Sequence, residues 1–260
     1  MDYWTFDLEP TKYTDDFYHI GAENAPCYLL KSTDGLILID TGLPKTLYVI
    51  FKNLNKLGFD YKDIKHIIHT HGHIDHFGGT RALVELTGAK TYIGFGDQDA
   101  CNGTNQLQYT NEFNMVYEEA FQPDVIVKDN QEIVIGDKRF LFVSTPGHTP
   151  GTMSLFFNVC DKGKEYRAGM FGGAGLLTMS KEYLARYNLP LSLRDDFIKS
   201  IDKMYNYQLD VHVGNHLGDN KHREKIKLID SNTNPFIDAS TWKWFLDKRK
   251  KEALEFFEKN

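Results

Sequence analysis

The sequence lacks several features that would place it in a specialised class. No run approaches the roughly 18 consecutive apolar residues that a membrane-spanning helix needs, so we expect no membrane partner. Its lysines and arginines are scattered apart from the run at 248–251, and the formal net charge is −6. A nucleic-acid partner is therefore not expected. We interpret the basic run as the solvated face of a C-terminal helix.

Cysteine is also scarce. The three cysteines, Cys27, Cys101 and Cys160, are widely spaced and odd in number, which fits a reducing compartment better than a disulfide framework. The first ten residues carry acidic side chains and no apolar segment, so we do not interpret them as a secretory signal. Together these features predict a cytoplasmic location.

The remaining composition is that of an ordinary globular protein. Hydrophobic residues make up 41% of the chain and charged residues 25%. A chain of 260 residues can bury a substantial core without dividing, and no linker or low-complexity tract interrupts it. We therefore expect residues 1–260 to form a single domain.

Short apolar runs alternate with helical patterns along the chain. In the first half, strands are expected at 25–31, 36–40, 64–68 and 91–94, with helices at 47–57 and 81–86. The stretch 95–123 is expected to be part helix and part surface loop. In the second half, a meander of three strands is expected at 125–127, 131–135 and 139–143. Further strands are expected at 153–159, 166–171 and 211–214. Helices are expected at 197–205 and near the C-terminus. Two β-then-α halves favour an α/β (α+β) fold with four layers, an αββα sandwich.

The decisive motif is Thr70-His71-Gly72-His73-Ile74-Asp75-His76. Imidazole and carboxylate groups are ligands for zinc and similar cations. At the end of a strand, residues two apart point the same way, so His71 and His73 can bind one cation. Asp75 and His76 lie slightly further along and can reach a second cation. The motif thus predicts a metal site with two ions.

Two later histidines also lie in settings that suit ligands. His148 occupies the tight turn Pro146-Gly147-His148-Thr149-Pro150-Gly151, and His216 follows the apolar run at 211–214. Either one alone would more often be a surface or hydrogen-bonding residue. The remaining histidines are assigned to core or surface, with His69 alone considered as a support for a ligand; they are His19, His66, His69, His212 and His222.

His-x-His-x-Asp-His, followed by a Gly-His turn and a late histidine, resembles the metallo-β-lactamase superfamily. Ile39-Asp40-Thr41-Gly42 is similar to another motif of this family, in which the aspartate supports the metal loop. The resemblance implies two Zn2+ ions. One would be held by His71, His73 and His148, and the other by Asp75, His76 and His216.

The chain departs from the common pattern of the superfamily at Gly173. Most members carry an aspartate there that bridges the two metals, whereas this chain has glycine. The chain resembles the third subclass of the true metallo-β-lactamases in three features. It lacks this aspartate, it has a histidine at 216, and its segment 234–238 precedes a helix. That subclass carries serines that hold the drug's carboxylate. Here glycines occupy 173 and 175, and Thr178 and Ser180 are the nearest hydroxyls.

These features predict a zinc-dependent hydrolase that opens a cyclic amide or ester of a small-molecule substrate with a metal-bound hydroxide, as β-lactamases do. Asp75 is the predicted catalytic residue, because its carboxylate can orient the nucleophile and carry a proton. A thioester or lactone hydrolase of the same superfamily is an alternative. A di-iron oxidoreductase and an inactive metal-binding scaffold are alternatives of other classes. The stretch 95–121 either walls the substrate pocket or contributes its aromatic side chains to the core.

Overall fold

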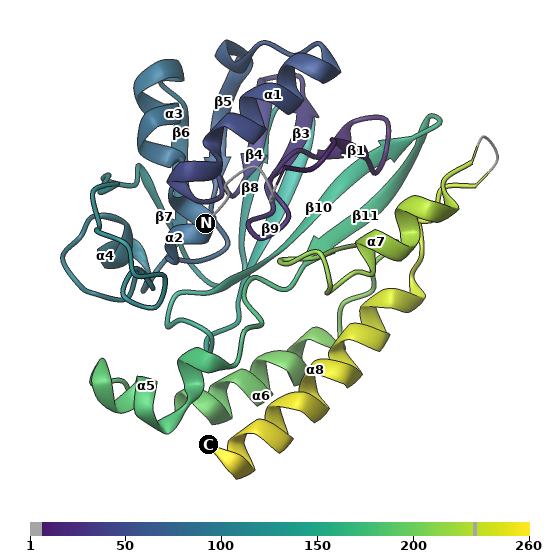
Figure 1. The fold of residues 1–260 in the computed structure, drawn as a ribbon. Coiled ribbons are helices and arrows are strands. Elements are labelled where there is room, and N and C mark those ends of the chain that lie inside the picture. The colour runs from purple at the N-terminus through teal and green to yellow at the C-terminus, as the bar shows by residue number, and fades with distance from the viewer. Residues whose placement is uncertain (1–6, 231–232) are drawn as a thin grey trace.

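The computed structural model describes residues 7–230 and 233–260, so the first six residues of the segment examined for a secretory signal lie outside it. Two β-sheets form the centre of the molecule (Figure 1). The first sheet has the strand order β1-β2-β3-β4-β5-β6-β7, and the second has the order β12-β11-β10-β9-β8. Strands β4 to β7 are parallel, whereas β8 to β11 are antiparallel and β12 runs parallel to β11.

The first sheet consists of β1 (Thr11–Lys12), β2 (Phe17–His19), β3 (Tyr28–Ser32), β4 (Gly35–Ile39), β5 (Ile64–Ile68), β6 (Lys90–Gly94) and β7 (Val125–Val127). The second consists of β8 (Gln131–Ile135), β9 (Lys138–Ser144), β10 (Met153–Asp161), β11 (Lys164–Met170) and β12 (Val211–Val213). The α-helices are α1 (Leu47–Leu57), α2 (Ile74–Phe77), α3 (Thr80–Thr87), α4 (Gln98–Cys101), α5 (Lys181–Arg186), α6 (Leu193–Met204), α7 (His222–Lys225) and α8 (Ser240–Lys259). Short 3-10 helices cover Pro44–Thr46, Tyr61–Asp63, Leu177–Met179 and Ile226–Leu228.

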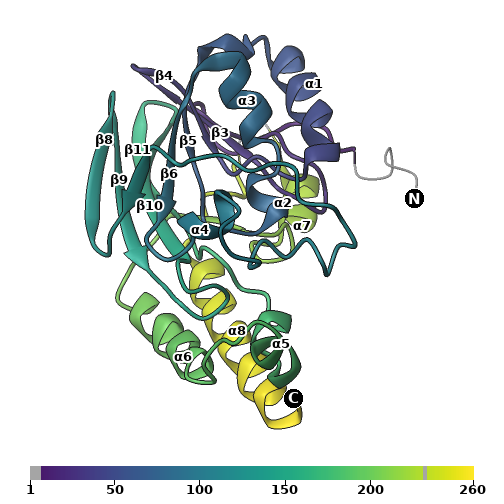
Figure 2. The ribbon, with the colours of Figure 1, turned by 90° about the vertical axis from the view of Figure 1, so that its left-hand side faces the viewer.

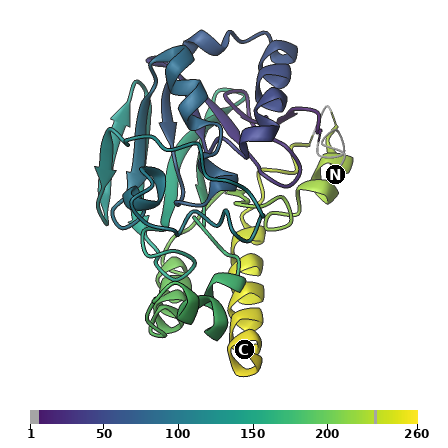
Figure 3. The ribbon, with the colours of Figure 1, turned by 60° about the vertical axis from the view of Figure 1, so that its left-hand side comes forward.

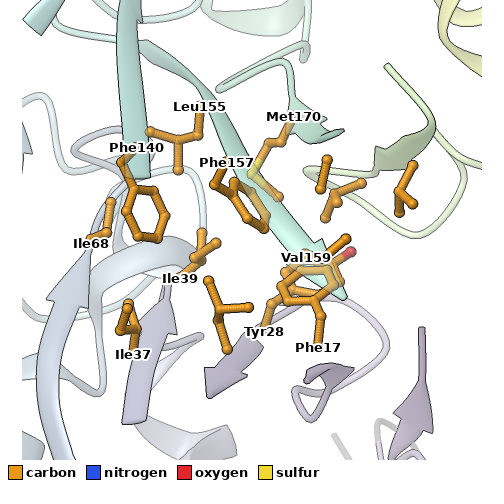
Figure 4. Close-up of a cluster of buried hydrophobic side chains, with 14 of the residues drawn as sticks. Phe17, Tyr28, Ile37, Ile39, Ile68, Phe140, Leu155, Phe157, Val159 and Met170 are labelled. Carbon is orange, nitrogen blue, oxygen red and sulfur yellow. The ribbon is translucent and has the colours of Figure 1, made fainter. Parts of the chain in front are cut away.

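The main core lies between the two sheets. Ile39 and Ile68 from the first sheet face Phe140, Leu155 and Phe157 from the second (Figure 4), and all five are fully buried. Apolar side chains on alternate positions of each strand meet there because neighbouring residues of a strand point to opposite faces. This packing fixes the two sheets against each other.

Helices cover the outer faces of both sheets. Ile50 of α1 and Leu83 of α3 pack against Leu38 and Ile67 of the first sheet. Helices α6 and α8 lie side by side and pack against Phe156 and other residues of the second sheet (Figures 2 and 3). The predicted αββα arrangement is therefore confirmed.

Most of the predicted elements are present, but one assignment was wrong. Val125–Val127 does not join the meander; it pairs in parallel with β6 as the edge strand of the first sheet. A strand of three residues carries no local signal for its partner, since pairing depends on the rest of the sheet. Helices α1 and α3 end at Gly58 and Gly88, whose φ angles of 77° and 67° lie in the left-handed region.

The structure bears on the cysteines, the search for membrane-spanning helices and the basic run. All three cysteines are free. No helix within 7–230 or 233–260 is long and apolar enough to cross a membrane. The basic run 248–251 lies on α8, and each of its four cations is within 4.0 Å of an acidic side chain. Lys248 and Lys251 are exposed, as expected for a solvated helix face, whereas the side chain of Arg249 is 18% exposed and pairs with the buried Asp219.

Candidate metal centre

The six predicted ligands come together from three distant parts of the chain. His71, His73, Asp75 and His76 follow β5, His148 lies in the turn between β9 and β10, and His216 follows β12. The structure groups them into two clusters, in each of which the ligand atoms all lie within 4.8 Å of one another. The first cluster comprises His71, His73 and His148, and the second comprises Asp75, His76 and His216.

The local geometry of the motif differs from the prediction. Strand β5 ends at Ile68, so His71 and His73 lie in the following turn and not at the end of a strand. Their rings nevertheless converge, with 3.1 Å between Nε2 of His71 and Nδ1 of His73. Asp75 and His76 lie in the short helix α2, and not in a loop. The spacing was therefore informative even though its geometric explanation was wrong.

Backbone and carboxylate acceptors orient three of the ligand rings. Nδ1 of His71 donates to the carbonyl of Gly172 (2.9 Å), and Nδ1 of His148 donates to the carbonyl of Gly175 (2.8 Å). Nδ1 of His76 donates to Oδ2 of Asp40 (2.7 Å). Each bond leaves Nε2 free to bind a metal, as in most metal sites with histidine ligands.

Asp40 has the supporting position that the family resemblance implied. It is 2% exposed, and besides His76 it accepts hydrogen bonds from the backbone N–H of Thr70 (2.9 Å) and from its hydroxyl (2.8 Å). The carboxylate thus joins the beginning of the motif to a ligand at its end.

The three histidines of the first cluster have pKa values that suit the binding of a cation. Burial, reinforced by neighbouring imidazoles, holds the pKa values of His71 and His73 well below their usual range. Burial also lowers the pKa of His148, to about 4. These rings are therefore neutral near pH 7, which is the form that binds metal.

The second cluster contains an unsatisfied polar atom. Nε2 of His76 is buried without a hydrogen-bond partner, and it lies 3.4 Å from Oδ2 of Asp75. Burial opposes a charge on His76, but Asp75 and Asp40 more than offset it and raise its pKa to about 10. Burial would likewise raise the pKa of Asp75, yet His76 and His216 hold it below its usual value. A cation between these side chains would supply the missing partner for His76.

The second cluster is accessible to solvent at His216. The side chain of His216 is 44% exposed, whereas the side chains of His76 and Asp75 are 1% and 9% exposed. A small molecule can therefore approach from the side of His216.

The other histidines lie outside both clusters. Nε2 of His69 contacts the Thr80 hydroxyl (3.1 Å), and its Nδ1 is 3.9 Å from Asp40, so it is adjacent to the support of the site. His66 contacts Tyr92 and Asp34 near the surface. The remaining three are buried in the core: His19, His212 and His222. His19 and His222 are not isolated, because their ring centroids are 5.1 Å apart.

The glycines of 172–175 have a role that the sequence did not reveal. A Cβ at Gly173 would lie 2.5 Å from Cδ2 of His148, and one at Gly175 would lie 2.9 Å from its Cε1. The His148 ring thus rests directly on this backbone, and the Gly175 carbonyl orients it. Of the two nearby hydroxyls, Thr178 contacts Nδ1 of His148 (3.2 Å), and Ser180 accepts the N-terminal hydrogen bond of α5 from Tyr183.

Gly173→Ala is expected to lower zinc binding at the first cluster, because the added methyl group must displace the ring of His148. Metal analysis after dialysis would measure the effect, with Gly218→Ala as the control because a Cβ there meets no atom within 4 Å. Two equivalents of zinc retained by Gly173→Ala would contradict this account of the glycine run.

The aromatic stretch at 95–121 lies partly beside the ligands and partly in the core. The ring of Tyr109 lies 4.9 Å from the ring of His73 and 5.9 Å from that of Tyr183, so this part borders the ligands. Tyr117 and Phe121 instead pack against a buried cluster that includes Phe77.

Sequence reasoning also missed Asp97, which lies just after β6. Its carboxylate contacts both loops that carry the first cluster. An acidic residue in the loop after a parallel strand was a signal, but nothing in the sequence specified its partners.

Comparisons with known proteins agree with this arrangement. The family model described as "Metallo-beta-lactamase superfamily" matches residues 20–161. BJP-1, a subclass B3 metallo-β-lactamase of Bradyrhizobium japonicum, has a TM-score of 0.89 at 27% identity, covering 100% of this chain and 97% of that one. LRA-12, a class B3 di-zinc metallo-β-lactamase from an Alaskan soil metagenome, has a TM-score of 0.85 at 25% identity, covering 98% and 97%. An N-acyl homoserine lactonase from Bacillus sp is 28% identical over 155 residues, which cover 50% of this chain and 56% of the lactonase.

The fold and the two ligand clusters define a metallo-hydrolase type of centre. The chain belongs to the metallo-β-lactamase superfamily. It spans about half the length of the curated relatives that it matches, and nearly the full length of the similar solved structures.

Proposed function

We propose that the protein is a dinuclear zinc hydrolase that opens a cyclic amide or ester. The observation that carries this proposal is the pair of clusters, each with three ligand atoms within 4.8 Å of one another. His71, His73 and His148 would hold one ion, and Asp75, His76 and His216 the other. Imidazoles with one carboxylate are a donor set that suits zinc, and the orphaned Nε2 of His76 fits such an ion.

Two bound zinc ions would supply Lewis acidity, which activates water near neutral pH and polarises a carbonyl group. The protein's own residues keep the ligands in place for this purpose. Asp40 holds His76, and the carbonyls of Gly172 and Gly175 hold His71 and His148. Asp75 is the proposed catalytic residue, because its carboxylate lies among the ligands and can accept a proton from water and pass it on.

The substrate that we place first is a β-lactam, with weak activity. The similar structures of BJP-1 and LRA-12, and the lack of a carboxylate at position 173, support this choice. A lactone or thioester is the second candidate. It is favoured by the similarity to the lactonase and by the glycines at 173 and 175, where no serine is available to hold a drug's carboxylate.

The proposal is tested with purified protein of measured metal content, assayed against nitrocefin, a homoserine lactone and an acyl thioester. Hydrolysis of at least one of them by zinc-loaded protein is the expected result. A visible absorption band from bound iron, with no hydrolysis, would favour the di-iron oxidoreductase instead. Bound metal without activity on any substrate would favour a metal-binding scaffold.

Penicillin hydrolysis is expected to show a raised KM and a less affected kcat, because an unanchored carboxylate costs binding more than chemistry. Steady-state kinetics on a penicillin and a carbapenem, compared with a lactone that lacks a carboxylate, would measure this difference. If the zinc-loaded enzyme turned over the lactone but neither drug, the β-lactam assignment would be wrong.

The proposed setting is the cytoplasm, where a small-molecule substrate would be met without a nucleic-acid or membrane partner. Three free cysteines without a disulfide support this location. Fractionation of the source cells, followed by detection of the protein, would test it.

A further inference from the structure

One buried carboxylate connects the two loops that carry the first cluster. Asp97 is 2% exposed and follows β6. Its Oδ2 accepts a hydrogen bond from the backbone N–H of Gly72 (2.8 Å) and another from the hydroxyl of Thr149 (2.6 Å). Its Oδ1 accepts one from the backbone N–H of Gly151 (2.8 Å).

These donors lie immediately beside the ligands. Gly72 separates His71 from His73, and Thr149 follows His148. All three ligands of the first cluster are therefore adjacent in sequence to a donor that is bonded to Asp97. Asp97 therefore acts on the ligands through the backbone that carries them and needs no direct contact with their rings.

We propose that Asp97 is a positioning residue for the first metal ion, whose carboxylate sets the distance between the His71–His73 turn and the His148 turn. The proposal rests on the proposed function, since it assumes that the first cluster holds a metal. Its counterpart is Asp40, which is bonded to His76 and Thr70 and thereby supports the second cluster. Because Thr70 precedes His71, Asp40 is also linked to the first cluster, whereas Gly72 and Thr149, which are bonded to Asp97, both lie beside ligands of the first cluster.

The hydrogen bonds of Asp97 indicate how Asp97→Asn would act. In the Asp97 carboxylate, each oxygen accepts one backbone N–H, from Gly72 or from Gly151. Asparagine has one acceptor oxygen, so its NH2 group must face one of these N–H donors in either orientation. If the oxygen faces Gly151, the His71–His73 turn loses its hydrogen bond from Gly72. If the oxygen faces Gly72 and Thr149, both turns stay attached, but the N–H of Gly151 in the His148 turn then faces an NH2 group. In either orientation one backbone donor is left opposed to another donor, which changes the distance of His148 from His71 and His73.

The test is zinc affinity at each cluster, measured by competition with a chromophoric chelator and independent of activity. Asp97→Asn is combined with His216→Ala, which leaves the first cluster whole, and separately with His148→Ala, which leaves the second whole. In the His216→Ala background, we expect Asp97→Asn to weaken zinc binding about 10–100-fold, the range found for groups that orient metal ligands. In the His148→Ala background, we expect no change.

Two further variants separate positioning from general damage to the fold. Thr149→Val removes a single donor and should weaken the first cluster in the same direction but to a smaller extent. Asp16→Asn alters another buried carboxylate with three donors, which are Thr14, Lys138 and Cys160. It should lower the thermal midpoint without changing either zinc affinity.

The outcomes are distinct. Equal weakening of both clusters by Asp97→Asn, or no weakening of the first, would overturn the positioning role while leaving the proposed function intact. Wild-type protein that binds no zinc would overturn both.

Discussion

His71→Ala is expected to reduce hydrolysis by more than about a hundredfold, beyond the 10–100-fold typical of residues that only support a metal ligand. Three protein ligands barely suffice for a catalytic zinc, so the loss of one leaves the ion weakly held. His71 is also central, with ring centroids 4.6 Å from His73, 4.1 Å from His76 and 4.7 Å from His148. Its removal would therefore disturb both clusters.

The measurement is kcat/KM on the best substrate of the panel, together with the zinc content of the same sample. His66→Ala is the matched control, because the ring of His66 is bonded to Tyr92 and Asp34 and lies outside both clusters. A His71→Ala protein with near-normal turnover would contradict the assignment of the first cluster as the catalytic metal site.

The ligand motif could be predicted from sequence because its information is local. His71, His73, Asp75 and His76 lie within six residues, and no chain folding is needed to bring them near each other. Predicting that His148 and His216 join them depended on the family resemblance. The structure brings all six together, but their binding of metal stays a prediction.

The layer order could also be predicted, because apolar periodicity distinguishes helices from strands. The pairing partner of a short strand could not be predicted from sequence. For that reason β7 was assigned to the wrong sheet. The single-domain organisation stays a prediction.

The supports of the site were hidden for a physical reason. The carbonyls of Gly172 and Gly175 orient two ligands, and every residue has a carbonyl, so residue type carries no signal. Asp97 has a carboxylate, but its role depends on two loops that meet only in the folded chain.

Asp75→Asn is expected to lower kcat by at least about a hundredfold, the usual scale of general acid–base catalysis, while zinc content falls only modestly. Asparagine keeps an oxygen that can bind a metal, but it cannot accept a proton near neutral pH. Asp75 is buried in α2, with Oδ2 3.4 Å from Nε2 of His76 and 3.8 Å from Nε2 of His216. The substitution therefore changes proton transfer more than it changes the shape of the cluster.

This prediction separates a catalytic role of Asp75 from a role as ligand alone. Turnover is measured on Asp75→Asn after reconstitution with zinc and metal analysis, so that a low rate cannot result from a missing ion. Asp99→Asn, an exposed carboxylate on α4, is the control and should behave as the wild type does. If fully loaded Asp75→Asn retained near-normal turnover, Asp75 would serve only as a ligand, and the proton would have to be carried by another group or by solvent. A large loss of kcat at full zinc occupancy is the expected result, because the substitution keeps an oxygen ligand but removes the proton acceptor and its negative charge.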